Sequence, residues 1–196
     1  MIDQEIRAFI AIELPAELRK MMGEFQAGLM RPRQGFVKWV NPASVHLTLK
    51  FLGNVRSKQL DSIKRELDDI AKDSKAFSIV TSETGCFPDL KRPRVFWLGL
   101  DGDIEELLKL QAKIDEALSR IGFPRENRPF TAHLTLARIK EEGSTADRLE
   151  FSQLVKDARF ERTFSMKVEN VYLMRSQLAA AGAVYTRLAE FPLTGR

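Results

Sequence analysis

The feature that most constrains this chain is a tetrapeptide that occurs twice, as His46-Leu47-Thr48-Leu49 and as His133-Leu134-Thr135-Leu136. The chain has two histidines, and each of them opens one copy. Leucine and threonine suit a pleated surface, and the strict alternation of the four residues predicts a half-buried strand in each copy. Successive side chains of a strand point to opposite faces. Each copy is therefore expected to present its histidine and threonine on one face and to bury its leucines on the other.

The composition is that of an ordinary globular protein. Hydrophobic residues make up 44% of the 196 positions and charged residues 30%, unlike a disordered or membrane-spanning chain. The net charge of +4 suits an anionic partner such as RNA, although many basic proteins bind none. Cys86 is the single cysteine, so no disulfide can form within the chain. No stretch reaches the roughly 20 apolar residues of a membrane helix, and acidic residues stand where a secretory signal carries positive charge. We expect a cytoplasmic protein without a membrane partner.

Periodicity along the rest of the chain predicts the order β-α-β-β-α-β-β-α-β-α-β-β, with the last two strands at 164–174 and 183–191. Strands joined by short turns favour antiparallel pairing, with helices packed on the outer side. The predicted fold class is α+β, a bilobal duplicated fold with two antiparallel sheets facing a central cleft and helices on the outside. We expect residues 1–196 to form a single domain of two intertwined lobes, each with one copy of the motif.

The paired histidines have several alternative explanations. A single histidine among apolar residues is usually a packed structural residue, but that does not explain two in the same tetrapeptide on the same face. A zinc site needs three or four nitrogen, sulfur or carboxylate ligands, and neither motif has such neighbours, so no metal is predicted. A serine nucleophile of the Ser-His-Asp type lacks its sequence context.

Two histidines and two hydroxyls are well suited to phosphodiester cleavage. One neutral imidazole takes a proton from water while one imidazolium gives a proton to the leaving oxygen, and each role is worth about 10² to 10⁴ in rate. A pKa near 6.5 for free histidine lets both protonation states coexist around neutral pH. The hydroxyls of Thr48 and Thr135 would donate hydrogen bonds to non-bridging phosphate oxygens. This scheme predicts no cofactor.

The paired His-x-Thr-x motifs resemble those of the 2H phosphoesterase superfamily, and in particular the RNA 2',3'-cyclic phosphodiesterases, also called 2'-5' RNA ligases. The similarity extends to the opening segment Arg7 to Pro15, to Trp39, to the extensions Lys50 to Gly53 and Ala137-Arg138, and to the tail Gly182 to Leu188. The resemblance implies hydrolysis of RNA 2',3'-cyclic phosphate ends to 2'-phosphate ends without a cofactor, together with reversible 2'-5' RNA ligation. It also implies that His46 is the proton donor and His133 the proton acceptor, an assignment that two near-symmetric motifs do not decide by themselves.

Further candidates flank the motifs. By resemblance Arg138 contacts phosphate, but alternation from His133 places it on the leucine face unless the strand ends or bulges at Ala137; the alternative is a solvated arginine. Lys50 lies on the His46 face by alternation and could meet phosphate, or it is a surface lysine. Phe9 and Trp39 could stack on a base, with core packing as the alternative that we favour for Phe9.

Two other functions stay open at this point. One is another 2H activity, on 2'-5' oligonucleotides or small cyclic nucleotides, and the other is a non-catalytic protein that binds RNA ends. The expected partner is RNA with a 2',3'-cyclic phosphate end, tRNA-derived ends being one candidate source. We expect a monomer with no obligatory protein partner; the natural RNA and the physiological relevance of ligation are not determined by the sequence.

Overall fold

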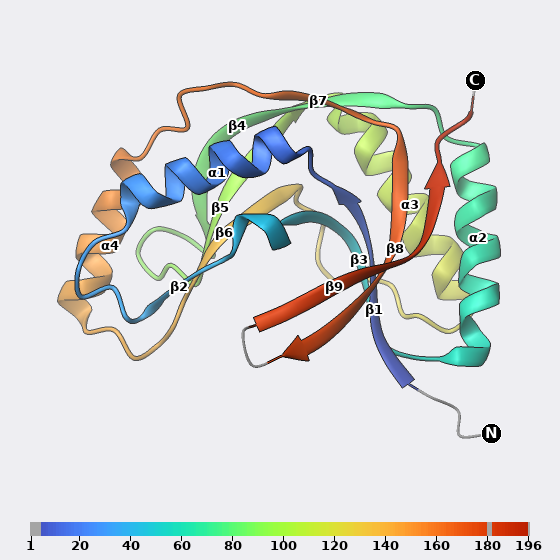
Figure 1. The fold of residues 1–196 in the computed structure, drawn as a ribbon, viewed down its shortest axis with the longest axis horizontal. Coiled ribbons are helices and arrows are strands. Elements are labelled where there is room, and N and C mark those ends of the chain that lie inside the picture. The colour runs from blue at the N-terminus through green and yellow to red at the C-terminus, as the bar shows by residue number, and fades with distance from the viewer. Residues whose placement is uncertain (1–4, 180–181, 196) are drawn as a thin grey trace.

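The computed structural model describes residues 5–179 and 182–195, and these form two antiparallel sheets with helices on their outer sides (Figure 1). The first sheet has the strand order β3-β1-β8-β9, with β3 at His46–Arg56, β1 at Glu5–Glu13, β8 at Asn170–Ala179 and β9 at Gly182–Pro192. The second has the order β2-β6-β5-β4-β7, with β2 at Val37–Trp39, β6 at His133–Ile139, β5 at Val95–Gly102, β4 at Phe77–Phe87 and β7 at Ser165–Val168. Each sheet thus contains one of the two motif strands, β3 or β6.

Four α-helices and two short 3-10 helices connect the described strands. Their bounds are α1 at Ala16–Leu29, η1 at Pro42–Ser44, η2 at Ser57–Gln59, α2 at Leu60–Lys72, α3 at Ile104–Arg120 and α4 at Thr145–Asp157. Figure 1 shows α2 and α3 together at one end of the molecule and α4 at the other. The predicted α+β class with antiparallel sheets and outer helices is confirmed. None of the described helices is both long and apolar enough to span a bilayer.

The N-terminal half of the chain, up to β5, and the C-terminal half, from α3 onward, exchange elements between the two sheets. Helix α1 follows β1 of the first sheet but packs on the second, where Phe25 lies 6.3 Å from Phe96 of β5 between ring centroids. Helix α3 follows β5 of the second sheet but packs on β3 and α2. Strand β4 of the N-terminal half lies in the second sheet, and strand β8 of the C-terminal half lies in the first. Each motif strand is therefore supported from behind by a helix of the other half.

The predicted strand at 164–174 is wrong in one respect, because it is two strands. Residues up to Val168 pair with β4 in the second sheet, and residues from Asn170 pair with β9 and β1 in the first. The chain passes from one sheet to the other at Glu169, while buried residues continue on both sides of it. Buried residues on both sides of a position do not show that the partner strand changes there.

The leucines of both motifs are anchored in one hydrophobic core. Leu47, Leu49, Leu134 and Leu136 are all buried, and all belong to the same cluster of packed side chains. The histidines and threonines of the motifs are only half-buried. The division into an anchored face and an accessible face is the one that alternation predicts.

Candidate active site

His46 is held in a defined orientation at the start of β3. Its Nδ1 lies 3.0 Å from the carbonyl oxygen of Ser44, and its ring stacks on Phe9 with centroids 4.5 Å apart. Tyr185 of β9 contacts the same ring edge-on at 4.9 Å. A carbonyl oxygen can only accept a hydrogen bond, so Nδ1 carries the proton in the neutral ring and Nε2 has the lone pair. Nε2 is therefore the nitrogen that is available to exchange a proton.

His133 repeats this arrangement at the start of β6. Its Nδ1 lies 2.7 Å from the carbonyl oxygen of Thr131, again two residues upstream, and Phe87 of β4 meets the ring edge-on at 5.0 Å. The same reasoning leaves Nε2 of His133 as the exchangeable position. Both motifs therefore present an imidazole whose tautomer is set by the backbone of its own segment.

The motif threonines lie beside the histidines on the same faces. Thr48 pairs across the first sheet with Ala11, and Thr135 pairs across the second with Trp97. Neither hydroxyl has a hydrogen-bond partner among residues 5–179 and 182–195, and both side chains are partly exposed. Both hydroxyls are thus available to a ligand. Cα atoms of β3 and β6 approach within 8 Å of each other, so the two motif strands are neighbours in space.

Each motif strand has a β-bulge at the second leucine of the motif. In β3, Thr48 pairs with Ala11 and Lys50 with Ile10, which leaves Leu49 as the extra residue. In β6, Thr135 pairs with Trp97 and Ala137 with Phe96, which leaves Leu136 as the extra residue. A bulge reverses the alternation that follows it.

The bulge in β6 places Arg138 on the face of His133 and Thr135. Arg138 is exposed, and its cross-strand neighbour on β2 is Lys38, which is exposed as well. Neither cation forms an ion pair with a residue that the structure describes. Alternation required the strand to end or bulge at Ala137 for Arg138 to face outward; the structure has a bulge one residue earlier, at Leu136, and it has the same effect. Lys38 was not found from the sequence, because its position beside Arg138 depends on the pairing of β2 with β6.

The corresponding bulge in β3, at Leu49, makes the prediction for Lys50 wrong. Lys50 is 2% exposed and lies on the buried face with its neighbour Ile10. Its ammonium forms an ion pair with Asp115 of α3 and donates a hydrogen bond of 2.7 Å to the carbonyl oxygen of Pro124. Phe51 takes the outward position instead and is 63% exposed. Alternation fails here because the bulge, which no local signal reveals, inverts the strand after Leu49.

The predicted base-stacking aromatics are placed differently. Phe9 is 2% exposed and is covered by His46 and Tyr185, so of its two alternatives the structure has the favoured one, packing, and not stacking on a base. Trp39 pairs with buried Ala137 and packs on Phe96 and Phe151 in the core, away from the His133 face. Both residues support the motif strands rather than line the accessible faces.

A charged pair lies close to His46. Glu13 of β1 is directly opposite His46 in the sheet. Arg187 of β9 donates two hydrogen bonds to the Glu13 carboxylate, one of them 3.0 Å long, and its guanidinium lies 4.5 Å above the ring of Tyr172. These hydrogen bonds hold the pKa of Glu13 below its usual range. Burial lowers the pKa of His46, while the Ser44 carbonyl and the Glu13 carboxylate oppose that shift.

The described residues contain no group of three or more histidine, cysteine, aspartate or glutamate side chains placed to hold a metal ion. The thiol of Cys86 is buried, which raises its pKa to about 12.

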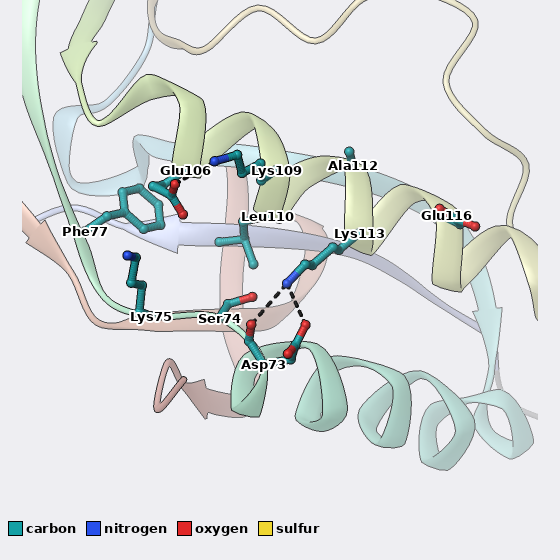
Figure 2. Close-up of a pocket in the computed structure, with 10 residues that line it drawn as sticks. All are labelled: Asp73, Ser74, Lys75, Phe77, Glu106, Lys109, Leu110, Ala112, Lys113 and Glu116. Atoms are coloured by element: carbon teal, nitrogen blue, oxygen red, sulfur yellow. Dashed lines mark hydrogen bonds and ion pairs between the residues drawn. The ribbon is translucent and has the colours of Figure 1, made fainter. Parts of the chain in front are cut away.

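A surface hollow of about 370 Å³ lies elsewhere, between the end of α2 and α3 (Figure 2). Acidic and basic side chains line it, and they pair with one another: Lys113 lies 2.7 Å from Asp73, and Lys109 lies 2.9 Å from Glu106. None of its lining residues belongs to either motif. The hollow is thus separate from the two-histidine site.

Comparison with known proteins places this geometry in a family. The model of the LigT-like phosphoesterases matches residues 12–97 and residues 98–185, one match for each motif. The chain belongs to this family. The resemblance predicted from the two His-x-Thr-x motifs is confirmed.

Members of the LigT-like phosphoesterase family are similar to this chain in sequence and structure over most of their length. The RNA 2',3'-cyclic phosphodiesterase of Methanothermobacter thermautotrophicus is 33% identical over 96% of this chain and 100% of that protein. The protein of the same name from Aquifex aeolicus is 33% identical over 81% and 82%. Among solved structures, TT0787 of Thermus thermophilus superposes with a TM-score of 0.79 at 29% identity over 97% of this chain and 100% of that one. E. coli LigT complexed with 3'-AMP has a TM-score of 0.77 at 27% identity over 97% and 99%.

Proposed function

We propose that this protein hydrolyses RNA 2',3'-cyclic phosphate ends to 2'-phosphate ends by acid–base catalysis with His46 and His133. The observation that carries the proposal is the repeated arrangement of the two motifs, each with a backbone-oriented imidazole beside an unpartnered threonine hydroxyl. The substrate class is supported by relatives named RNA 2',3'-cyclic phosphodiesterase that match 81% and 96% of the chain. E. coli LigT has been crystallised with 3'-AMP, a nucleotide whose phosphate is on the 3'-oxygen, one of the two oxygens that a 2',3'-cyclic phosphate joins.

The proposed step needs one neutral and one charged imidazole. Nε2 of His133 takes a proton from water as the water oxygen forms a bond to phosphorus. The bond from phosphorus to the 3'-oxygen breaks, and Nε2 of His46 gives its proton to that oxygen. The product carries a 2'-phosphate and a 3'-hydroxyl. Each proton transfer is worth about 10² to 10⁴ in rate.

Donors and cations near the histidines would stabilise the phosphate. The Thr48 and Thr135 hydroxyls donate to its non-bridging oxygens, where negative charge increases in the transition state. Arg138 and Lys38 lie opposite each other on neighbouring strands, and like charges in such a pair repel. A bound phosphate would relieve this repulsion, so we include Lys38 with Arg138 in the phosphate-binding site. Lys50 is not part of it.

The donor role of His46 depends on the bound substrate. Burial lowers its pKa in the free protein and so favours the neutral ring. An anionic phosphate beside Nε2 favours the charged ring and raises the pKa in the complex. The Glu13 carboxylate acts in the same direction. His46 would thus be charged by the substrate that it protonates.

The decisive experiment is turnover of an oligonucleotide with a 2',3'-cyclic phosphate end, followed by end-group analysis. We expect a 2'-phosphate product; a 3'-phosphate product would overturn the regiochemistry, and binding without turnover would identify an RNA-end-binding protein. Mononucleotide and 2'-5' oligonucleotide substrates test the other 2H activities, and the reverse reaction on 2',5' ends tests ligation.

The two roles are separated by a substrate whose leaving group needs no proton, such as a nitrophenyl phosphodiester. We expect His46→Ala, but not His133→Ala, to recover activity on it, and the opposite pattern would exchange the roles. A cytoplasmic location, a monomeric state and independence from a protein partner stay predictions.

A further inference from the structure

In each motif strand, the bulge at the second leucine of the motif is backed by a buried glutamine; β3 has a further register shift at Leu52 that is not part of this arrangement. Gln26 of α1 donates from Nε2 to the carbonyl oxygen of Leu136 at 2.7 Å and to that of Val40 at 2.9 Å. Gln111 of α3 donates from Nε2 to the carbonyl oxygen of Leu49 at 3.3 Å. Leu136 and Leu49 are the extra residues of the two bulges. Gln26 is 1% exposed and Gln111 is 8% exposed.

Both glutamines occupy positions where an apolar residue would be expected. Gln26 stands between buried Met22 and Leu29 on the core-facing side of α1, and Gln111 stands between Leu110 and Ile114 on that of α3. A bulge locally disrupts the hydrogen-bond ladder of the strand. The carbonyl oxygen of Leu136 also accepts a hydrogen bond from the Val40 backbone N–H at 2.9 Å, so Gln26 gives this oxygen a second donor and links it to the Val40 carbonyl oxygen. Gln111 is the side-chain donor to the Leu49 carbonyl oxygen. Buried polar groups that lose a partner are costly. An apolar side chain of the same size supplies no donor.

The bulge decides which side chains reach the histidine faces. With it, Arg138 follows Thr135 outward, and Phe51 follows Thr48 outward. With strict alternation instead, Arg138 would point into the core and Lys50 would leave it. A donor that stabilises the bulged register therefore acts on the phosphate site without touching it.

We propose that Gln26 and Gln111 are positioning residues that hold the two motif strands in their bulged register. Gln26 acts on the His133 strand and Gln111 on the His46 strand. Since α1 and α3 each pack behind the other half's motif strand, each half of the chain fixes the active residues of the other. The proposal rests on the function proposed above for what the two faces bind. Gln26 has two acceptors and the shorter bonds, so it is expected to have the larger effect.

The test replaces each glutamine with methionine, which keeps an unbranched side chain but removes both donors. Because the chain has two histidines, its imidazole Cε1–H region in proton–carbon NMR spectra contains two signals, which His46→Ala and His133→Ala assign. We expect Gln26→Met to move the His133 signal and its response to inorganic phosphate, with little change at His46. Gln111→Met should do the reverse. The matched control is Gln153→Met, at an exposed glutamine of α4, which should move neither.

A purely structural role predicts a different pattern. If each glutamine only stabilises the core, both histidine signals move together or neither moves, and the proposal is overturned. Should Gln26→Met fail to fold, Gln26→Glu is used in its place. A buried carboxyl without a cation is kept protonated and retains one donor, so a smaller shift confined to His133 is expected.

Kinetics provide the second readout. We expect Gln26→Met to lower kcat/KM by about 10- to 100-fold, because misplacement by about 1 Å can cost 10² in rate. Arg138→Ala should then lower kcat/KM by a smaller factor in the Gln26→Met background than in the wild type. In the Gln111→Met background it should lower kcat/KM by the same factor as in the wild type. Equal costs in all three backgrounds would refute the link between Gln26 and Arg138. If the wild-type protein shows no turnover, the proposed function fails while the NMR comparison still decides the positioning role.

Discussion

Replacing Lys50 with methionine should destabilise the protein and leave phosphate binding almost unchanged. The Lys50 and Asp115 side chains are 1% and 15% exposed, and Lys50 also donates to the carbonyl oxygen of Pro124. Methionine keeps the packing of the stem but leaves the Asp115 carboxylate without its cation. Removing one partner of a buried ion pair costs about 3–5 kcal/mol.

The structure places the expected loss at the lower end of that range. Asp115 retains some contact with water and still accepts a hydrogen bond from the Glu126 amide at 3.3 Å. We therefore expect a loss of about 3 kcal/mol in the free energy of unfolding. For a chain of this size that corresponds to a fall in Tm of about 6–12 °C. The double variant Lys50→Met with Asp115→Leu should recover much of the loss, since it removes both charges together.

The assay combines urea unfolding with turnover below the unfolding transition. Lys38→Met is the matched control, because the same substitution on the His133 face should raise KM with little effect on stability. If Lys50→Met unfolded like the wild type but raised KM as Lys38→Met does, Lys50 would belong on the phosphate-binding face. The buried placement argued from the bulge would then be refuted.

Four further predictions follow from the same site. His46→Ala and His133→Ala should each lower turnover by at least about 10², and the double variant should be little worse than the worse single one; a folded single variant that retains a tenth of the activity contradicts the roles. The pH–rate profile of the wild type should be bell-shaped. Glu13→Gln should move its alkaline limb to lower pH, because losing the carboxylate lowers the pKa of the charged His46 donor. An alkaline limb that stays at the same pH would show that it does not report the titration of His46. Activity should persist in excess EDTA, since in the proposed mechanism two imidazoles supply both proton transfers. A loss of activity that zinc or magnesium restores would refute that mechanism. Calorimetry should show one cooperative transition if the chain is a single domain of two intertwined lobes, and two transitions would show separate domains.

Local sequence patterns predicted the parts of this site that depend on one strand alone. Alternation placed each motif histidine with its threonine and buried the motif leucines, and the structure has them so. The carbonyl contacts of His46 and His133 are also local, since each acceptor is two residues upstream. The family followed from the two motifs and their flanking residues, and the family model matches one segment around each motif.

Interactions between distant segments decided the rest. Glu13 and Arg187 meet beside His46 although they are 174 positions apart, and Lys38 joins Arg138 through the pairing of two strands. The bulges that turn Arg138 outward and Lys50 inward depend on the register with β1 and β5 and on the glutamines of α1 and α3. A strand's two-residue period is a property of its own backbone, whereas the point at which that period shifts depends on the strands and helices that pack against it. The sequence alone therefore supplied the two-histidine hypothesis, and only the tertiary structure showed which cations lie on the face of His133.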